Sequence, residues 1–422
     1  MRVSEERVLS PQARLRRRHE RDVFRAISGQ VAVSRSQLAE QVGLSGQSVG
    51  RIVRSLLDAG LVEETEIERS DGPGASPVGL RVRAEGAFAL GFGLERDRLN
   101  GVMLDLEGTV RWQKTRKLGK RETAKQVLQG LEDDMDSLLA DPAWSERLDK
   151  LCGVGVAAPG PVDLVSGTIV GPPNFPTWEH VNVADELGRS LGVPVLVDNS
   201  ATAGAVGVAW RLPPNHAPYL YCYWGLGIGG GLVSNDDVYR GTTGNAVEIG
   251  HVVADPTGRP CACGGRGCLE AEASAAALMR DAAAHGQFRT LTDVVIASHE
   301  RPELAALLAS AADKVASVLL SVINIVDVDQ LLIGGEHFRE VQEVFLPVIR
   351  DRVEGQAFRR RIAKTTVEVS ENGEVANAIG AAALIFHSVL PAQVLERTGL
   401  GRPRELRAAR PRGLWDPLRR QS

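Results

Sequence analysis

Three cysteines and one histidine beyond the middle of the chain have the types and spacing of metal ligands. Cys261, Cys263 and Cys268 lie in one glycine-rich loop, and His251 precedes that loop. Thiolate sulfur and imidazole nitrogen are the ligands that a four-coordinate zinc ion prefers. Because four protein ligands complete the tetrahedron and leave no position for a water molecule, the pattern predicts a structural Zn2+ rather than a catalytic one. Free thiols or a disulfide are the alternative for the same loop.

Two acidic side chains flank the predicted zinc loop. Glu248 lies just before His251, and Glu270 lies just after Cys268. A zinc ion would bring these two carboxylates and the imidazole close together, where they can hydrogen-bond several hydroxyl groups at once. The flanking residues therefore favour a ligand that carries several hydroxyls.

The same stretch resembles a known family. The chain reads Gly-Asn-Ala-Val-Glu-Ile-Gly-His from Gly244 and Cys-Ala-Cys-Gly-Gly-Arg-Gly-Cys-Leu-Glu from Cys261. Both runs resemble the signature of the ROK family of sugar kinases and sugar-responsive repressors, and Val247 is the only departure in the first run. The resemblance covers about residues 88–391 and implies a two-lobed, actin-like (ribonuclease H-like) sugar-kinase fold.

The resemblance also implies which residues contact a sugar. They are Asn174, Asn199, Ser200, Glu248, His251 and Glu270. His251 would have two tasks, with one ring nitrogen on zinc and the other free to donate to a hydroxyl. For the two asparagines the alternative is an ordinary role in a turn or at the end of a strand.

Two groups that phosphoryl transfer requires are replaced. The family's catalytic aspartate lies in an Asn-Asp-Ala-Asn run, which here is Asn-Ser-Ala-Thr with Ser200 in place of the aspartate. The first phosphate turn reads Gly-Leu-Glu-Arg-Asp at residues 93–97, where Glu95 and Asp97 would repel phosphates; the second glycine-rich turn, residues 225–231, is retained. Because serine is no base at neutral pH, the sequence predicts that the protein is not an enzyme. An active hexose kinase with an appended regulatory domain is the alternative.

Ser200 also bears on the identity of the sugar. In the kinases, the replaced aspartate binds the hydroxyl that becomes phosphorylated. Serine should bind this hydroxyl less strongly, so the site should no longer require the 6-hydroxyl of a hexose. A pentose such as xylose, or a modified sugar, then fits the pocket. The alternative is an empty pocket in a repressor that is controlled by a protein partner.

The N-terminal residues have the pattern of a winged helix-turn-helix domain. Ser34 and Ser45 are positioned as N-caps of two helices that are joined by a short turn containing Gly43. The expected elements are helices at residues 14–27, 35–41 and 46–59 and strands at residues 61–64 and 78–82. This order predicts DNA binding through the last of the three helices, and a protein-interaction domain is the alternative.

Polar residues of the helix pair are the candidate DNA contacts. They are Ser36, Ser45, Gln47, Ser48, Arg51 and Arg54. Small or polar side chains at the start of the second helix can approach base edges, and its arginines can meet phosphates. The wing tip at residues 72–77 lacks the arginine of the family's Gly-Arg-Pro tip, which argues against its insertion into the minor groove.

Behind this domain, strands and helices alternate in two sets, which predicts an α/β body of two lobes around a cleft. We expect a DNA-binding domain at residues 1–86, a sugar-kinase-like effector domain at 87–391, and a basic, disordered tail at 392–422.

Composition limits the functional classes. The 422 residues include 24% charged residues and carry a net charge of −4, so any DNA contact must come from a local basic face. With no signal peptide and no apolar run near the roughly 18 residues of a membrane span, we expect a cytoplasmic protein. The combined prediction is a repressor of carbohydrate genes that binds operator DNA as a homodimer, or a dimer of dimers, and responds to a sugar.

Overall fold

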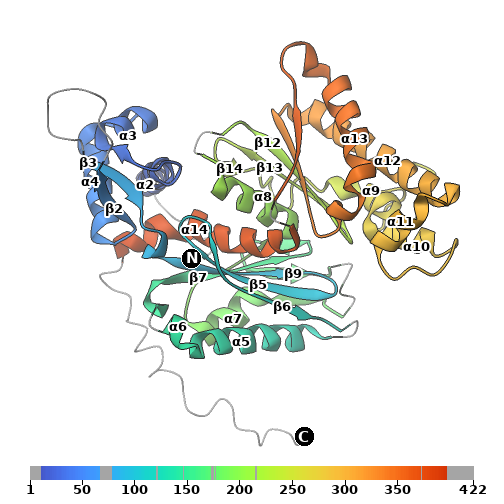
Figure 1. Cartoon of the computed structure of the whole chain (residues 1–422). Coiled ribbons are helices and arrows are strands. Elements are labelled where there is room, and N and C mark those ends of the chain that lie inside the picture. Colours follow the sequence, from blue (N-terminus) through green and yellow to red (C-terminus); the bar gives the residue numbers. More distant parts are fainter. Residues whose placement is uncertain are drawn as a thin grey trace, which may run out of the picture.

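A computed structural model describes residues 11–66, 78–119, 122–145, 147–172, 175, 177–213, 216–371 and 373–396. Three parts follow one another along this chain: a small N-terminal domain, a first lobe and a second lobe (Figure 1). The predicted wing tip, Asn174 and nearly all of the predicted tail lie outside the described residues.

The N-terminal domain is a winged helix-turn-helix, as the sequence predicts. Its elements are α2 (Pro11–Ser28), β1 (Val33–Ser34), α3 (Arg35–Val42), α4 (Gly46–Asp58), β2 (Val62–Glu66) and β3 (Val78–Val82), with the strands in the order β1-β3-β2. Ser34 accepts a hydrogen bond from the backbone N–H of Gln37, and Ser45 accepts one from that of Ser48. Both predicted N-caps are therefore present, and Gly43 ends α3 at φ 64°, where glycine is favoured.

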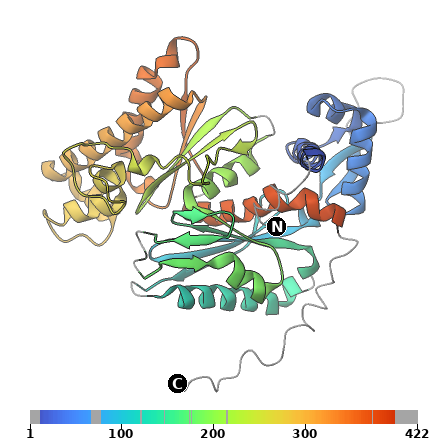
Figure 2. The same cartoon turned by 180° about the vertical axis from the view of Figure 1, so that it is seen from behind.

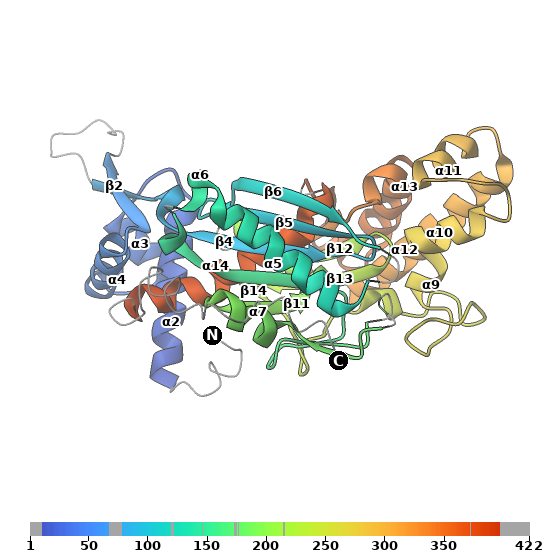
Figure 3. The ribbon, with the colours of Figure 1, turned by 90° about the horizontal axis from the view of Figure 1, so that it is seen from below.

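The first lobe is a five-stranded sheet with helices on its outer face. Its elements are η1 (Ala84–Gly86), β4 (Phe88–Leu94), β5 (Arg98–Asp105), β6 (Val110–Lys117), α5 (Ala124–Ala140), α6 (Pro142–Ser145), η2 (Leu148–Lys150), β7 (Leu151–Ala158), β8 (Val162–Asp163), β9 (Thr168–Val170), β10 (His180–Asn182), α7 (Val183–Leu191) and β11 (Val195–Asn199). The main strands lie in the order β11-β7-β4-β5-β6, and β10-β9-β8 form a small separate sheet. Seen from below, α5 runs along the outer face of the main sheet (Figure 3).

The second lobe repeats this plan with its own five-stranded sheet. Its elements are α8 (Ser200–Arg211), β12 (Tyr219–Trp224), β13 (Ile228–Ser234), β14 (Asp237–Val238), η3 (Ile249–His251), α9 (Leu269–Ala273), α10 (Ala275–Ala282), α11 (Leu291–Ser298), α12 (Pro302–Val326), β15 (Gln330–Gly334), α13 (Phe338–Gln356), η4 (Phe358–Arg361) and β16 (Thr366–Val369). The chain then returns through η5 (Gly373–Val375) to α14 (Ala376–Glu396), which packs on the sheet of the first lobe. The strands lie in the order β14-β13-β12-β15-β16. The α/β architecture with two lobes is confirmed, and α14 continues through Glu396, past the boundary expected at residue 391.

Two helices, α8 and α14, lie between the sheets and hold the lobes together (Figure 2). They approach so closely that a Cβ on Gly380 of α14 would lie 1.9 Å from the carbonyl oxygen of Ala203 in α8. On the other face of α14, a Cβ on Gly155 of β7 would lie 1.8 Å from the carbonyl oxygen of Ala381. Only glycine fits at such backbone contacts, so the small residues of both helices are what allows the lobes to join.

Among the described residues, one helix has the length and apolar composition of a membrane span, namely α12. Asp313 and Lys314 interrupt the apolar run of this helix. Ten of its side chains are buried in the core of the second lobe, which is the role of a central helix in a packed domain.

Candidate functional site

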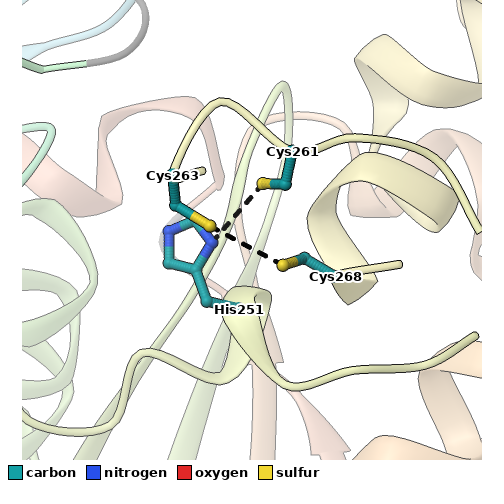
Figure 4. Close-up of side chains that lie close together, drawn as sticks. All are labelled: His251, Cys261, Cys263 and Cys268. Carbon is teal, nitrogen blue, oxygen red and sulfur yellow. Dashed lines mark hydrogen bonds between the residues drawn. The ribbon is translucent and has the colours of Figure 1, made fainter. Parts of the chain in front are cut away.

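The four predicted zinc ligands lie together (Figure 4). Nδ1 of His251 is 3.7 Å from Sγ of Cys261, and the Sγ atoms of Cys263 and Cys268 are 3.7 Å apart. All four ligand atoms lie within 4.8 Å of one another. A tetrahedral zinc ion with bonds of about 2.3 Å to sulfur would hold two sulfurs about 3.8 Å apart. The donor set and its spacing therefore fit a metal such as zinc.

Backbone hydrogen bonds hold the cysteine loop in this shape. The N–H of Cys261 donates to the carbonyl of Gly265, and the N–H of Gly264 donates back to Cys261. The N–H of Gly265 also donates to Sγ of Cys263 over 3.4 Å, which lowers the pKa of that thiol and favours the thiolate that a metal binds. Gly267 has φ 69°, and a Cβ there would lie 1.6 Å from the carbonyl oxygen of Asp255. The glycines are thus required by the fold of the loop.

Three of the predicted sugar contacts surround this centre. His251 turns Nδ1 toward the cysteines, which leaves Nε2 for another partner. Oε1 of Glu248 accepts a hydrogen bond from the side chain of Asn199 over 3.1 Å, and burial raises the pKa of Glu248. The structure therefore brings Glu248, His251 and Asn199 together from η3 and the end of β11.

Glu270 faces the second glycine-rich turn. Its Oε2 accepts a hydrogen bond from the backbone N–H of Ile228 over 3.0 Å, and a Cβ on Gly227 would lie 2.7 Å from the same oxygen. The retained glycine turn is therefore shaped around Glu270. Gly227 therefore lies directly against the carboxylate of Glu270.

Asn245 is a positioning residue that the sequence analysis did not single out. Its side chain accepts a hydrogen bond from the N–H of Val162 (2.9 Å) and donates one to the carbonyl of the same residue (3.0 Å). This pair of hydrogen bonds ties the loop before Glu248 to the first lobe.

Val247, the departure from the family signature, has φ 66°, which is unusual for a β-branched residue and natural for the glycine of the family. Both Asn245 and Val247 lie in the signature run Gly-Asn-Ala-Val, so that run could have identified them from the sequence.

Ser200 occupies the first position of α8. Asn199 caps this helix by accepting a hydrogen bond from the N–H of Ala201 over 2.8 Å. Oγ of Ser200 is buried and has no hydrogen-bond partner in the described part of the chain. An unsatisfied buried hydroxyl costs stability, so a ligand hydroxyl at this position would satisfy it.

The structure buries Glu95, the central residue of the first phosphate turn. Glu95 does not face an open cleft; its side chain is only 7% exposed and is enclosed between the lobes. It accepts hydrogen bonds from the hydroxyl of Tyr223 (3.0 Å) and from the side-chain amide of Asn377. Burial, and secondly the negative charge of Glu336, raise the pKa of Glu95 well above its usual value. Protein side chains thus fill the space beside this turn, and Asp97 remains at the surface.

Three of the candidate DNA-binding residues share the exposed face of α4. Val49, Ile52, Val53 and Leu56 of α4 are buried against α2 and the strands. The opposite face carries Gln47, Arg51 and Arg54, which are exposed, with Ser48 half-buried at the first turn. In the preceding turn and helix, Ser45 serves as the N-cap of α4, and Ser36 lies 3.0 Å from the hydroxyl of Ser34.

Comparisons with known proteins agree with this architecture. Residues 90–388 match the ROK family, and residues 16–63 match a winged helix-turn-helix DNA-binding family. The xylose repressor of Bacillus subtilis (strain 168) is 30% identical over 270 residues, 63% of this chain and 68% of that protein. The DNA-binding transcriptional repressor Mlc of Escherichia coli (strain K12) is 24% identical over 371 residues, 84% of this chain and 90% of that protein.

Solved structures show the same fold. The crystal structure of a ROK family transcriptional regulator, described as a homolog of E. coli Mlc, has a TM-score of 0.74 at 22% identity and covers 91% of this chain and 98% of its own. A ROK family glucokinase from Streptomyces griseus, in complex with glucose and AMPPNP, has a TM-score of 0.58 at 25% identity over 71% of this chain and 99% of its own. Since the family match spans well over half of the sequence, the chain belongs to the ROK family.

Proposed function

We propose that this protein is a DNA-binding transcriptional repressor of carbohydrate genes that responds to a sugar. The observation that carries the proposal is the pairing of a winged helix-turn-helix, with its polar α4 face exposed, and a ROK body in one chain. Relatives of this chain include proteins named xylose repressor and DNA-binding transcriptional repressor Mlc. We assign the domains to residues 1–86 and 87–391 and place the protein in the cytoplasm, where operator DNA lies.

In this proposal α4 is the recognition helix. Gln47 and Ser48 at its first turn approach base edges, while Arg51 and Arg54 meet phosphates. Ser36 and Ser45 lie beside the same face and add hydrogen bonds to the DNA backbone. Two such domains in a homodimer would read the two halves of a palindromic operator.

The effector site in this proposal is the pocket beside the cysteine loop. Asn199, Glu248, His251 and Glu270 bind sugar hydroxyls, and Asn174, outside the described residues, completes the set. Bound zinc at His251, Cys261, Cys263 and Cys268 would supply a structural cross-link that fixes the His251 ring and leaves Nε2 to donate to a hydroxyl. Ser200, with its unpartnered buried hydroxyl, makes the pocket tolerant of a pentose.

We further propose that the protein does not phosphorylate its sugar. Ser200 cannot accept the proton of an attacking hydroxyl, a loss that costs roughly 10²-fold to 10⁴-fold in rate. The side chains packed around Glu95 also fill the region where a first phosphate turn would hold a nucleotide. The likeness to a glucokinase keeps an active sugar kinase as the second candidate.

The test combines DNA binding with nucleotide turnover. In a gel shift on DNA upstream of its own gene, we expect sequence-specific binding that glucose, xylose or another sugar of a panel changes. Arg51→Ala should weaken binding to all sequences alike, whereas Gln47→Ala should alter the preference among bases. Specific DNA binding that no sugar changes would favour control by a protein partner.

In a coupled assay we expect no ATP consumption with any of these sugars. ATP turnover at an ordinary enzyme rate would refute the repressor assignment in favour of the kinase.

A further inference from the structure

One helix connects the candidate sugar pocket to the DNA-binding domain. The twelve residues of α8 span about 18 Å. Its first residue, Ser200, is one of the candidate sugar contacts, and its last turn lies beside the N-terminal domain, whose α2 and α4 contact the neighbouring α14 (Figure 1). A movement of α8 along its axis would therefore displace residues both at the candidate sugar contacts and at the DNA-binding domain.

At the far end of α8, the DNA-binding domain holds the helix through Arg25 of α2. The guanidinium donates hydrogen bonds to the carbonyls of Ala209 (2.8 Å), Trp210 (3.0 Å) and Leu212 (3.2 Å). Arg25 is only 6% exposed. Carbonyls in the last turn of a helix lack partners within it and carry its negative partial charge, so a buried arginine binds there favourably.

Aromatic side chains also pack at this contact between α2 and the last turn of α8. The Arg25 guanidinium lies 5.1 Å from the ring centre of Trp210, and Phe24 stacks on that ring at 6.2 Å. Phe386 of α14 stacks on Trp210 at 5.2 Å. The last turn of α8 is thus enclosed by side chains of α2 and α14, so it cannot shift without moving α2.

At the near end, Asn199 couples α8 to the pocket. Its side-chain oxygen caps the helix at Ala201, and its amide nitrogen donates to Glu248 over 3.1 Å. A sugar hydroxyl placed between Asn199 and Glu248 must replace or reshape that hydrogen bond. Because the same side chain caps α8, ligand binding changes the position of the helix terminus.

We propose that α8 transmits sugar binding to the DNA-binding domain, and that Arg25 is the positioning residue through which the helix moves that domain. The inference rests on the proposed function, since it requires both a sugar and an operator. The sugar must bind more tightly to one of two positions of α8, and the Arg25 contact must differ between them, because a ligand with equal affinity for both shifts nothing.

Arg25→Met tests the proposal. The substitution keeps the length of the side chain but removes the hydrogen bonds to the α8 carbonyls. The domain stays attached through other contacts, such as the stacking of Phe24 on Trp210 and the packing of α2 and α4 against α14. Arg189→Met is the matched control, because Arg189 is an exposed arginine of α7 that donates a hydrogen bond to the carbonyl of Asp185 in its own helix.

The quantity to measure is the ratio of DNA affinities with and without sugar, using DNA upstream of the gene and glucose or xylose. In the wild type and in Arg189→Met we expect a ratio in the range of about 5-fold to 150-fold that is typical of allosteric proteins. In Arg25→Met we expect a ratio within about 2-fold of unity, while sugar affinity by calorimetry and DNA affinity without sugar are preserved. A wild-type ratio in a folded Arg25→Met protein overturns the role of α8 and Arg25 and leaves the proposed function intact. No response in the wild type itself overturns both.

Hydrogen exchange in the wild-type protein gives a second measurement that needs no variant. Sugar binding should change the exchange rates of amides at residues 22–28 and 209–212, beside the Arg25 contact. Changes confined to the pocket, with binding verified by calorimetry, would overturn the inference even if Arg25→Met fails to fold.

Discussion

Replacement of Glu95 by glutamine should make the protein less sensitive to rising pH. The Glu95 carboxyl lies between the two lobes, where Tyr223 and Asn377 donate hydrogen bonds to it and Glu336 lies near it. Glutamine has nearly the same size, keeps an oxygen that can accept, and carries no charge at any pH. Glu95→Gln therefore removes the titration and leaves the packing in place.

The sign and size of the effect follow from the raised pKa of Glu95. Above its ordinary value of 4.5, the unfolded chain releases this proton while the folded protein, whose pKa is higher, retains it. The free energy of unfolding then falls as pH rises, by up to about 1.4 kcal/mol per pH unit, until the folded-state pKa is passed. As pH rises above 4.5, we therefore expect the wild type to lose more stability than Glu95→Gln, which has no such titration.

Urea denaturation of both proteins across this range measures the difference. Glu107→Gln is the matched control, because it makes the same substitution at an exposed position in the turn after β5. Parallel stability curves for the wild type and Glu95→Gln would show that Glu95 is already ionised in the folded state. That result would refute the inference that Glu95 is enclosed between the lobes.

Four further predictions concern the metal loop, a buried ion pair, the sugar pocket and the DNA-binding domain. Cys263→Ala or a strong chelator should lower the melting temperature and abolish the sugar response; an unchanged response after verified metal loss would count against a structural zinc. Arg240→Met leaves the buried Asp198 unpaired and should cost about 3–5 kcal/mol in urea denaturation, part of which Asp198→Asn should restore. By calorimetry, Ser200→Asp should shift preference from xylose toward glucose; a wild type that already strongly prefers glucose, together with no change in the variant, would contradict the role of Ser200. Ser45→Ala removes the N-cap of α4 and should destabilise the DNA-binding domain by about 1 kcal/mol, with thermal melting as the check.

Local patterns explain why much of the fold could be predicted. Ser34, Ser45 and Gly43 mark helix ends through hydrogen bonds and backbone preferences that depend on a few neighbouring residues. The spacing of His251 and the loop cysteines likewise reflects a ligand set that is nearly contiguous in the sequence. Such features can be read before the structure is known because the interacting groups are close along the chain.

Contacts between distant segments could not be read in this way. The sequence predicts that Glu95 would repel phosphates, but it does not reveal that Glu95 is buried against Tyr223 and Asn377, which are more than a hundred residues away in the sequence. Arg25 has the same appearance in the sequence as the other arginines of α2, and only the docking of that helix on the body gives it the carbonyls of α8.

The residue types thus determined which chemical groups the protein can use. They are the thiols of the cysteine loop, carboxylates that can bind hydroxyls, and a helix pair with an exposed polar face. The tertiary structure decided which of them meet, because burial and hydrogen bonding between lobes depend on how the two sheets pack against α8 and α14. A side chain acquires its pKa and its partner from that packing, and both are properties of the assembled fold rather than of any stretch of sequence.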